Sequence, residues 1–358
     1  MKEVINLAGP TVKIVDSPIP EPNDDQVLIK VVVSGSNPKD WKCPDLAADP
    51  NNAILQLYPQ LSEGVNQGDD IAGIVEKVGK NVYEFKPGDR VGAFHEMIAI
   101  GGSYAEYAIA YSHTTFHLPK ETSFEEAATI PLAGLTAAIA LYHHLALPFP
   151  WMPAKAAIPC VIYGGSTAVG AFAIKLLRRS NVHPIIAVAG KGASYIEPLL
   201  DRSKGDTIVD YRNGSEQTIQ GIRDALRGKE LKHVLDTIVQ DQTTQILKSV
   251  VAPGGIVNAV LGGERDASPG VATNTWVSSA HEASGDNDCR ELSYIFCRWF
   301  SRELQRGIQG EAHAFSGHPY EVRPGGLHGV RDALQDLKDN KASAVKYIFR
   351  IADTPGLA

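Results

Sequence analysis

A glycine-rich turn between an apolar run and an amphipathic pattern constrains the fold of this chain more than any other feature. The apolar run is Cys160–Tyr163, the turn reads GGSTAVG over residues 164–170, and apolar side chains then recur at helical spacing up to Leu177. A strand, a tight turn and a helix in this order present backbone N–H groups and a positive helix end to a pyrophosphate. The turn therefore predicts a dinucleotide site, although the strict G-x-G-x-x-G spacing is not met.

Strand-like and helical segments alternate after this turn. The helix expected after the turn ends with Arg178 and Arg179, where the helix dipole favours cations. Such alternation predicts a parallel, doubly wound sheet of the Rossmann type, and therefore an α/β fold. The further strand candidates are residues 184–189, 207–210, 234–238 and 256–261.

The first third of the chain has a different pattern. Short runs rich in β-branched residues are separated by turn signals such as Pro-Gly-Asp at 87–89, so this part is expected to be all-β. A helical stretch begins near Thr122 and is interrupted near Pro131. With 358 residues, the chain is long enough for two domains, each with its own core. The β-like runs are residues 26–33, 71–78, 90–94 and 104–110, and helices at 290–306 and 330–337 and a strand at 344–351 are expected near the end.

Composition excludes several classes of protein. The net charge of −7 comes without a basic stripe, so nucleic-acid binding is not expected. No apolar run approaches the roughly 18 residues that span a bilayer, and the first residues show no export signal. Four scattered cysteines suggest neither a disulfide framework nor a zinc clamp. We therefore expect a cytoplasmic protein that does not associate with membranes.

The end of the second Rossmann strand bears on the choice of cofactor. NAD-binding domains carry an acidic residue about 20 positions after the glycines, where it holds the ribose hydroxyl. Here the stretch at 187–191 reads AVAGK, which lacks an acid and ends in a lysine. This favours NADPH, whose 2′-phosphate a lysine accommodates. The cofactor-binding candidates are Gly164, Gly165, Ser166, Thr167, Ala168, Val169, Lys191, Ser194, Tyr195, Tyr211, Ile238, Leu261 and Gly262.

Other chemistry-bearing residues have weaker support. A serine at a strand-to-helix turn is also the nucleophile position of an α/β-hydrolase, but this turn lacks the last glycine of G-x-S-x-G. The acid and base that a hydrolase needs have only Asp236 and His281 as candidates, and their sequence surroundings are unremarkable. The adjacent pair His143-His144 points in two directions on a helix, so an ordinary structural role is expected. His95 and the following Glu96 are candidates for the border of a substrate cleft.

Several motifs together give the chain a resemblance to a known superfamily. They are NPKDWK at 37–42, GDDIAGIV at 68–75, KPGDRV at 86–91, GSYAEY at 102–107, the glycine turn, and residues 341–351. With these motifs the chain resembles the medium-chain dehydrogenases/reductases, nearest the zinc-independent quinone oxidoreductases, the enoyl reductases and the trans-acting enoyl reductases of fungal polyketide pathways. The resemblance implies a GroES-like catalytic domain of residues 1–131 and 310–358 and a Rossmann domain of residues 132–309.

Two positions argue against catalytic zinc. The zinc-dependent alcohol dehydrogenases of this superfamily place a cysteine where Asn37 lies and a His-Glu pair where Asp69 and Asp70 lie. A single aspartate would be a poor remnant of the three-ligand set that catalytic zinc prefers. We therefore expect no metal, and expect hydride transfer to a carbon that is already electrophilic, as in an enone, an enoyl group or a quinone.

The resemblance places three residues at the nicotinamide end of the active site. They are Asn37, Lys42 and Thr136, with Lys42 expected to orient the cofactor or stabilise an oxyanion and Thr136 to touch the nicotinamide. The site needs hydrogen-bond donors for the developing oxyanion rather than a strong base. Asp40 is expected to be structural, and Tyr58 is a candidate proton donor.

The sequence leaves the substrate and the assembly open. The expected substrate is a small enone or quinone. One alternative is an acyl chain on a carrier protein, reduced by a trans-acting enoyl reductase of a polyketide synthase. A second is a carbonyl, as in the alcohol dehydrogenases. A third is that the protein binds a nucleotide without catalysis and has a regulatory role. Both a monomer and a homodimer are compatible with the pattern.

Overall fold

The chain divides into two compact units. The computed structural model describes residues 1–260, 265–282, 289–309 and 315–357. Unit 1 comprises residues 1–132 and 293–358, and unit 2 comprises residues 133–292.

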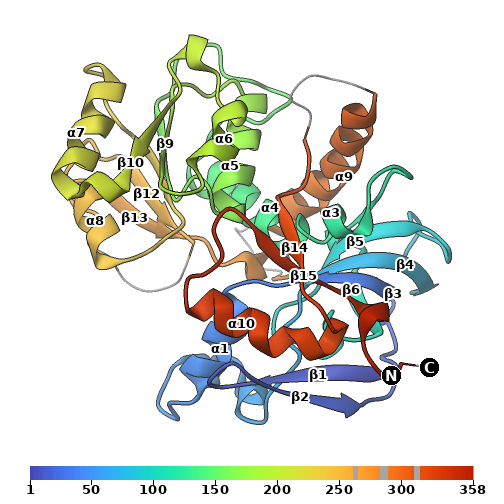
Figure 1. Cartoon of the computed structure of the whole chain (residues 1–358). Coiled ribbons are helices and arrows are strands. Elements are labelled where there is room, and N and C mark those ends of the chain that lie inside the picture. The colour runs from blue at the N-terminus through green and yellow to red at the C-terminus, as the bar shows by residue number, and fades with distance from the viewer. Residues whose placement is uncertain (261–264, 283–288, 310–314, 358) are drawn as a thin grey trace. The chain divides into compact units, whose positions relative to one another are not determined.

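Unit 2 is built on a six-stranded parallel sheet (Figure 1). Along the sheet the order is β10-β9-β8-β11-β12-β13, which in chain order is 3-2-1-4-5-6. This is the order of dinucleotide-binding sheets, in which the order reverses between the first and fourth strands, here β8 and β11. The strands are β8 (Cys160–Tyr163), β9 (Ile185–Ala189), β10 (Thr207–Asp210), β11 (His233–Asp236), β12 (Ile256–Ala259) and β13 (Val271–Asn274).

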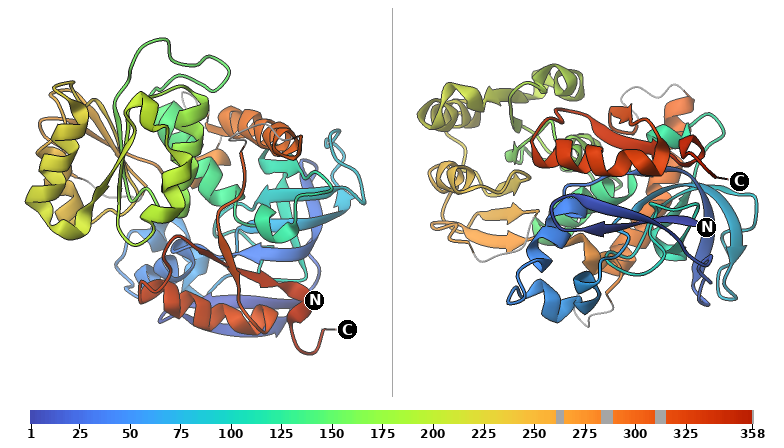
Figure 2. Two further views of the ribbon diagram at one scale, coloured as in Figure 1. Left: turned by 45° about the horizontal axis from the view of Figure 1, so that its top comes forward. Right: turned by 60° about the horizontal axis from the view of Figure 1, so that its bottom comes forward.

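Helices cover both faces of this sheet. Figures 1 and 2 show α7 and α8 on one side and α5 and α6 on the other. Alternate strand residues such as Val161 and Val188 pack with Ile222 and Ile246 of the first pair in one buried cluster. The strands are apolar on both faces because each face is covered, as expected of a parallel sheet. The helices are α5 (Ala168–Arg179), α6 (Ala193–Ile196), α7 (Ser215–Leu226) and α8 (Asp241–Lys248).

Unit 1 contains a seven-stranded sheet and a separate hairpin. The sheet order is β14-β15-β3-β4-β5-β7, and β6 also pairs with β3. The last strand of the chain thus lies beside one of the first, because β15 pairs antiparallel with β3. The strands are β3 (Gln26–Gly35), β4 (Asp70–Val78), β5 (Arg90–Phe94), β6 (Tyr107–Tyr111), β7 (Thr115–His117), β14 (Tyr320–Val322) and β15 (Lys346–Arg350), with β1 (Lys2–Leu7) and β2 (Thr11–Asp16) in the hairpin.

Short helices complete unit 1. α1 (Lys39–Ala47) and α2 (Ile54–Leu57) follow β3, α3 (Phe124–Ala127) follows β7, and α10 (Val330–Lys338) precedes β15. The buried face of α10 joins the core of the sheet. The chain then enters unit 2 through α4 (Pro131–Ala138), which continues as a π-helical stretch over Ile139–His144. The expected interruption near Pro131 is therefore the start of a helix, a position that proline tolerates because its N–H is not needed there.

The return of the chain to unit 1 comes earlier than the boundary of 310 that the resemblance implies. The helix α9 (Cys289–Ile308) lies mostly in unit 1, from Ser293 onward. Its Arg298 donates to the backbone oxygen of Thr115 at 2.9 Å, and its Phe300 ring meets Phe116 edge-on at 5.8 Å. These contacts with β7 assign the helix to the β-rich unit, which alternation patterns in a sequence do not reveal.

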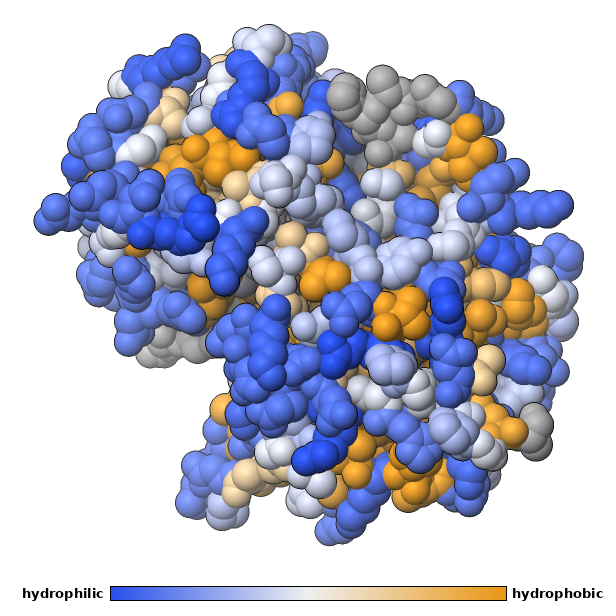
Figure 3. All heavy atoms as spheres, in the orientation of Figure 1, coloured by the Kyte–Doolittle hydropathy of each residue, from blue (hydrophilic) through white to orange (hydrophobic). Residues whose placement is uncertain are grey.

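Most strand predictions agree with the structure to within two residues. The expected strand at 104–110 is observed at Tyr107–Tyr111, because the N–H of Tyr104 goes to the side chain of Asn66 and Ala105 only bridges Glu3. No helix in the described ranges is both long and apolar enough to cross a bilayer. The face seen in Figure 3 is mostly polar, with scattered apolar patches.

Candidate functional site

The glycine turn of unit 2 is closed by contacts that exclude side chains. Gly164 has φ +84°, and a Cβ there would lie 2.3 Å from Oγ1 of Thr237. A Cβ on Gly170 would lie 2.3 Å from the carbonyl oxygen of Gly164. Both positions therefore require glycine, the first for the turn and the second for close packing of α5 against it.

The start of α5 is capped so that its remaining N–H groups are available. Thr167 is the N-cap, and its Oγ1 accepts from the N–H of Gly170 at 3.0 Å and lies 3.0 Å from Oγ1 of Thr237. Ser166, Ala168 and Val169 are partly exposed around this cap. The other N–H groups of a first helical turn have no partner within the helix, so this end attracts an anion. A backbone cradle without Cβ atoms at the switch point between β8 and β11 fits a dinucleotide pyrophosphate.

The predicted 2′-phosphate residues lie at the ends of two adjacent strands. Lys191 follows β9, is exposed, and contacts no acid in the parts of the chain that the structure describes. A Cβ on Gly190 would meet the ring of Tyr211, which follows β10, at 2.7 Å. The structure thus brings Tyr211 beside the Lys191 loop. Ser194 is exposed on α6, and Tyr195 is half-buried there.

The remaining cofactor candidates lie after β11 and β12. Ile238 approaches the turn closely, since a Cβ on Gly164 would be 2.8 Å from its Cγ1. Leu261 and Gly262 lie outside the described residues. Asp236, a candidate acid for a hydrolase, accepts from the N–H groups of Ile238 and Val239 and from Oγ1 of Thr243, so it holds the turn into α8.

Asp70 of unit 1 gathers three distant parts of the chain. Its Oδ2 accepts from Nδ2 of Asn37 and from Nζ of Lys346, both at 2.6 Å. Its Oδ1 accepts from the N–H of Leu132 at 2.8 Å. Lys346 also donates to Oδ1 of Asn37 at 3.1 Å. A Cβ on Gly35 would lie 3.0 Å from Cε of Lys346, so glycine there makes room for the pair.

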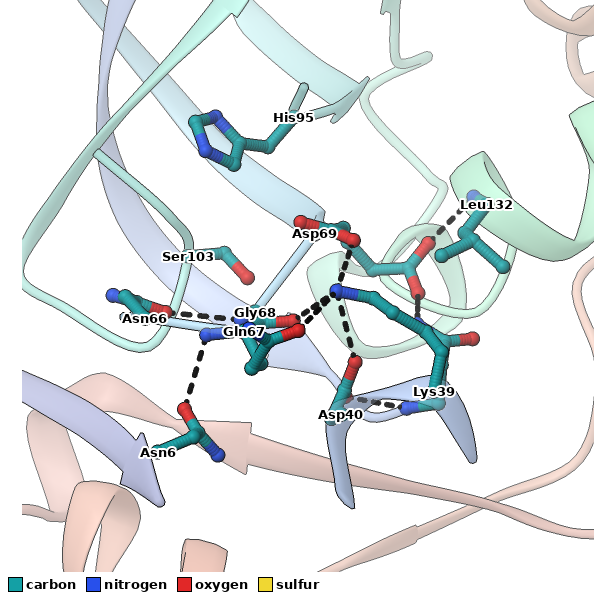
Figure 4. A network of polar contacts seen from close by, with 12 residues as sticks. Asn6, Lys39, Asp40, Asn66, Gln67, Gly68, Asp69, His95, Ser103 and Leu132 are labelled. Atoms are coloured by element: carbon teal, nitrogen blue, oxygen red, sulfur yellow. Dashed lines mark hydrogen bonds and ion pairs between the residues drawn. The ribbon is translucent and has the colours of Figure 1, made fainter. Parts of the chain in front are cut away.

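A second lysine is buried among two other aspartates (Figure 4). Nζ of Lys39 donates to the backbone oxygen of Gln67 at 2.7 Å, pairs with Asp69, and lies 3.3 Å from Oδ1 of Asp40. Oδ2 of Asp40 accepts from the Tyr104 hydroxyl at 2.6 Å and from the backbone N–H three residues before it at 2.7 Å. The expected structural role of Asp40 agrees with these contacts.

This second cluster contains one more carboxylate than ammonium. Burial raises the pKa of Asp40 to about 7, against the lowering effect of Lys39. Burial likewise raises the pKa of Asp69 to about 6, again opposed by Lys39. Burial by itself disfavours the Lys39 ammonium, but Asp69 and Asp40 hold its pKa above the usual value. Both carboxyl groups therefore take up a proton at a higher pH than a free aspartate does.

The predicted catalytic residues have different surroundings. Asn37 is 4% exposed and belongs to the Asp70 network, whereas Lys42 is half-buried on α1, with its Nζ 5.6 Å from the Trp41 ring, outside that network. Burial lowers the pKa of Lys42. Thr136 is buried on α4 of unit 2. Tyr58 is partly exposed after α2.

The histidine candidates also differ in their surroundings. His95 is buried, and its ring nitrogens face the backbone oxygens of Ile109 and Ala99 at 2.7 and 3.2 Å. His143 is exposed and His144 partly buried at the end of the π-helical stretch. Within the described ranges, no group of three or more His, Cys, Asp or Glu side chains is arranged to hold a metal ion.

Sequence reasoning missed the two buried lysines. Lys39 lies inside the NPKDWK motif, and Lys346 occupies the first position of the apolar closing strand, so both were visible only as parts of motifs. A charged residue in a strand that is otherwise apolar and buried could have indicated such a lysine, because buried charges are almost always paired with an opposite charge. The strand order and the glycine cradle of unit 2 define a dinucleotide-binding domain, which is joined in one chain to the β-rich unit 1.

Comparisons with known proteins show which family of dinucleotide-binding proteins the chain resembles. The family model of the alcohol dehydrogenase GroES-like domain matches residues 23–120. The trans-enoyl reductase fsr4 of Gibberella fujikuroi is 40% identical over 335 residues, covering 92% of each chain. The solved structure of the CurK enoyl reductase has a TM-score of 0.73 at 18% identity and covers 97% of this chain and 98% of that one. The structure of mycobacterial Rv1454c complexed with NADPH has a TM-score of 0.72 at 20% identity, covering 97% and 99%.

The chain belongs to the trans-enoyl reductases of the medium-chain dehydrogenase/reductase superfamily. It is an oxidoreductase of the enoyl reductase type, which transfers hydride to an activated carbon–carbon double bond. The predicted fold, a GroES-like domain with a Rossmann sheet, is confirmed.

We expect Lys346→Met to destabilise unit 1 by about 3–5 kcal/mol, because it leaves the buried Asp70 carboxylate without its cation. Urea unfolding followed by fluorescence measures this loss. Lys338→Met is the matched control, since it removes a partly exposed pair with Asp45 and a contact of the ammonium with the Trp41 ring, and it should cost about 1 kcal/mol. Equal costs for the two variants would contradict the assigned role of the Asp70 network.

We expect Asp69→Asn to flatten the pH dependence of stability between about pH 4 and pH 7. The raised pKa values mean that the folded wild type binds more protons than the unfolded chain in this window, so its free energy of unfolding falls as pH rises. The substitution removes one of the two groups with a raised pKa, and it also removes the negative charge of Asp69, which helps to raise the pKa of Asp40. Urea unfolding at several pH values measures the slopes, with Asp24→Asn on the exposed Lys80 pair as control. Parallel slopes for wild type and Asp69→Asn would refute this assignment.

Proposed function

We propose that this protein is a trans-acting, NADPH-dependent enoyl reductase. Its substrate is an α,β-unsaturated acyl chain held as a thioester on the carrier domain of a separate polyketide synthase. The observation that carries this proposal is the 40% identity with a trans-enoyl reductase over 92% of both chains. The glycine cradle and the residues beside it support the cofactor assignment.

The preference for NADPH rests on the charge at the end of β9. The position where NAD-binding sheets carry an acid is taken by Gly190 and the exposed Lys191. An acid there would repel a 2′-phosphate, whereas an ammonium without an acidic partner attracts it. Tyr211 packs against Gly190, and we assign its hydroxyl to donate to the same group.

When bound, NADPH supplies a hydride to the β-carbon of the enoyl thioester. The protein must then stabilise the enolate oxygen that develops on the thioester carbonyl. We assign this task to Lys42, a half-buried ammonium outside the Asp70 and Lys39 networks, which therefore do not neutralise it. Burial in a less polar environment strengthens its interaction with an anion. Thr136 is assigned to contact the nicotinamide, and Asn37, held by Asp70 and Lys346, to shape the substrate site.

We expect Lys191→Ala to raise the KM for NADPH at least tenfold while leaving the KM for NADH unchanged. A charged hydrogen bond to the 2′-phosphate contributes on the order of 2 kcal/mol, and NADH lacks that phosphate. Initial rates with both cofactors measure the effect. Lys229→Ala, which removes another exposed lysine of unit 2, serves as control and should change neither value. An equal rise for both cofactors would refute the assigned role of Lys191.

We expect the protein to oxidise NADPH with an enoyl thioester of N-acetylcysteamine, and faster still with the same chain on a carrier domain. Lys42→Ala should lower kcat about 10- to 100-fold, because it removes oxyanion stabilisation, while Lys120→Ala should not. Stopped-flow absorbance measures the rates with thioesters, quinones and aldehydes. Tight NADPH binding without turnover of any acceptor would instead support a non-catalytic role, and activity confined to quinones would support a quinone reductase.

A further inference from the structure

The loop of residues 147–158 presents a preorganised aromatic surface. The Phe149 ring stacks with Tyr142, with centroids 5.2 Å apart, and with Trp151, with centroids 4.9 Å apart and planes within 8°. Trp151 is 42% exposed and the next residue, Met152, is 68% exposed. Figure 2 shows this loop, in green, standing out from its unit. An indole held by stacking loses little freedom on binding, and tryptophan and methionine are enriched where proteins associate.

Backbone contacts hold this loop in place. The N–H of Ala154 donates to the oxygen of Ser180 at 2.8 Å, and Nδ2 of Asn181 donates to the oxygen of Ala154 at 2.7 Å. The N–H of Ile158 donates to the oxygen of His183 at 2.8 Å. The aromatic surface is therefore fixed to the segment that joins α5 to β9.

Cations lie on this loop and on the neighbouring segments that precede β9 and β10. Nζ of Lys204 donates to the amide oxygen of Asn181, the residue that holds the loop. Arg178 donates to the backbone oxygen of Leu199 at 3.0 Å. Lys155 is exposed within the loop itself. Lys204 and Arg178 lie near the carboxylate of Asp201, but neither forms a direct ion pair with an acid among the described residues.

The acids of the same segments are already engaged. Residues 147–158, 175–183 and 197–206 contain six lysines or arginines and three acids. Of the acids, Glu197 pairs with Arg202, the partly exposed Asp201 accepts from Oγ of Ser203 at 2.6 Å, and the buried Asp206 accepts from Nδ1 of His183 at 2.7 Å. Lys175 is buried, so five cations and two acids, Glu197 and Asp201, are exposed or partly exposed there. The surface is thus locally basic in a chain whose net charge is −7.

This basic aromatic surface lies at the amino edge of the unit 2 sheet. Its three segments lead into the first residues of β8, β9 and β10, and these strands are parallel. The glycine turn follows the other end of β8, at the carboxyl edge. A partner on the amino edge therefore does not compete with the cofactor for that turn.

We propose that this surface, centred on Trp151 and Met152 and rimmed by Lys155, Arg178 and Lys204, docks an acidic face of the synthase that carries the acyl chain. The proposal rests on the proposed function, which requires that a second protein deliver the substrate. The aromatic pair supplies the apolar centre of the interface, and the cations select a partner of opposite charge and speed its association. Because the cofactor turn lies at the other edge, the synthase stays bound while the cofactor exchanges.

The test compares one acyl chain in two forms. The double variant Lys155→Glu, Lys204→Glu and the variant Trp151→Ala are assayed with the enoyl chain on the intact synthase and with the same chain as the N-acetylcysteamine thioester. We expect kcat/KM for the synthase-bound chain to fall about tenfold or more at low salt, and the value for the small thioester to stay unchanged. Lys120→Glu is the control for the charge reversal, since it alters an exposed lysine of unit 1.

Direct binding of the synthase, measured by biolayer interferometry with wild type and variants, separates this proposal from the proposed function. If wild type reduces neither substrate, the proposed function fails, while the binding measurement still decides the docking surface. Unchanged synthase binding in both variants overturns the proposal, as does an equal loss on both substrates. Two further outcomes would also overturn the proposal. If the substitutions abolish binding to phosphatidylserine vesicles while synthase binding persists, the surface belongs to a membrane. If they abolish self-association in ultracentrifugation while synthase binding persists, it belongs to a second copy of the chain.

Discussion

The architecture of unit 1 depends on how Asp70 is neutralised. Its carboxylate is fully buried and accepts from Asn37, from Lys346 and from the N–H of Leu132. The donors come from the loop that follows β3, from the start of β15 and from the last residue of the unit before the chain leaves it. A buried charge is tolerated only when it is paired and hydrogen-bonded, so the register of these segments is fixed together with the pair.

The Lys39 cluster applies the same physical rule with a different outcome. Two carboxylates share one ammonium there, and burial raises the pKa of both, which favours their protonation. The superfamily pattern places zinc ligands at Asn37 and Asp69 in the alcohol dehydrogenases, whereas here each of these side chains contacts a lysine. In unit 1 the buried carboxylates are therefore neutralised by lysines of the same chain.

The sequence predicted the parts of the fold that local patterns encode. Cys160–Tyr163, Thr207–Asp210 and Arg90–Phe94 were located to the residue, since apolar runs and glycine turns mark them. The affiliation of α9 was not predictable, because it depends on contacts of Arg298 and Phe300 with β7. The candidate site was predicted only in part for the same reason. The glycine cradle is formed by residues close together in the sequence, whereas the pairing of Lys346 with Asp70 joins residues 276 positions apart.

That separation bears on the order in which the protein is completed during synthesis. Unit 2 is one continuous segment, so it can fold once residue 292 has left the ribosome. Unit 1 has to wait for the closing strand. Until then Asp70 is without the ammonium of Lys346, and the end of β3 at residues 33–35 is without its partner strand. Such an edge invites pairing with other chains. The nascent protein therefore passes through a state in which its nucleotide-binding half is complete while its β-rich half still needs protection from aggregation.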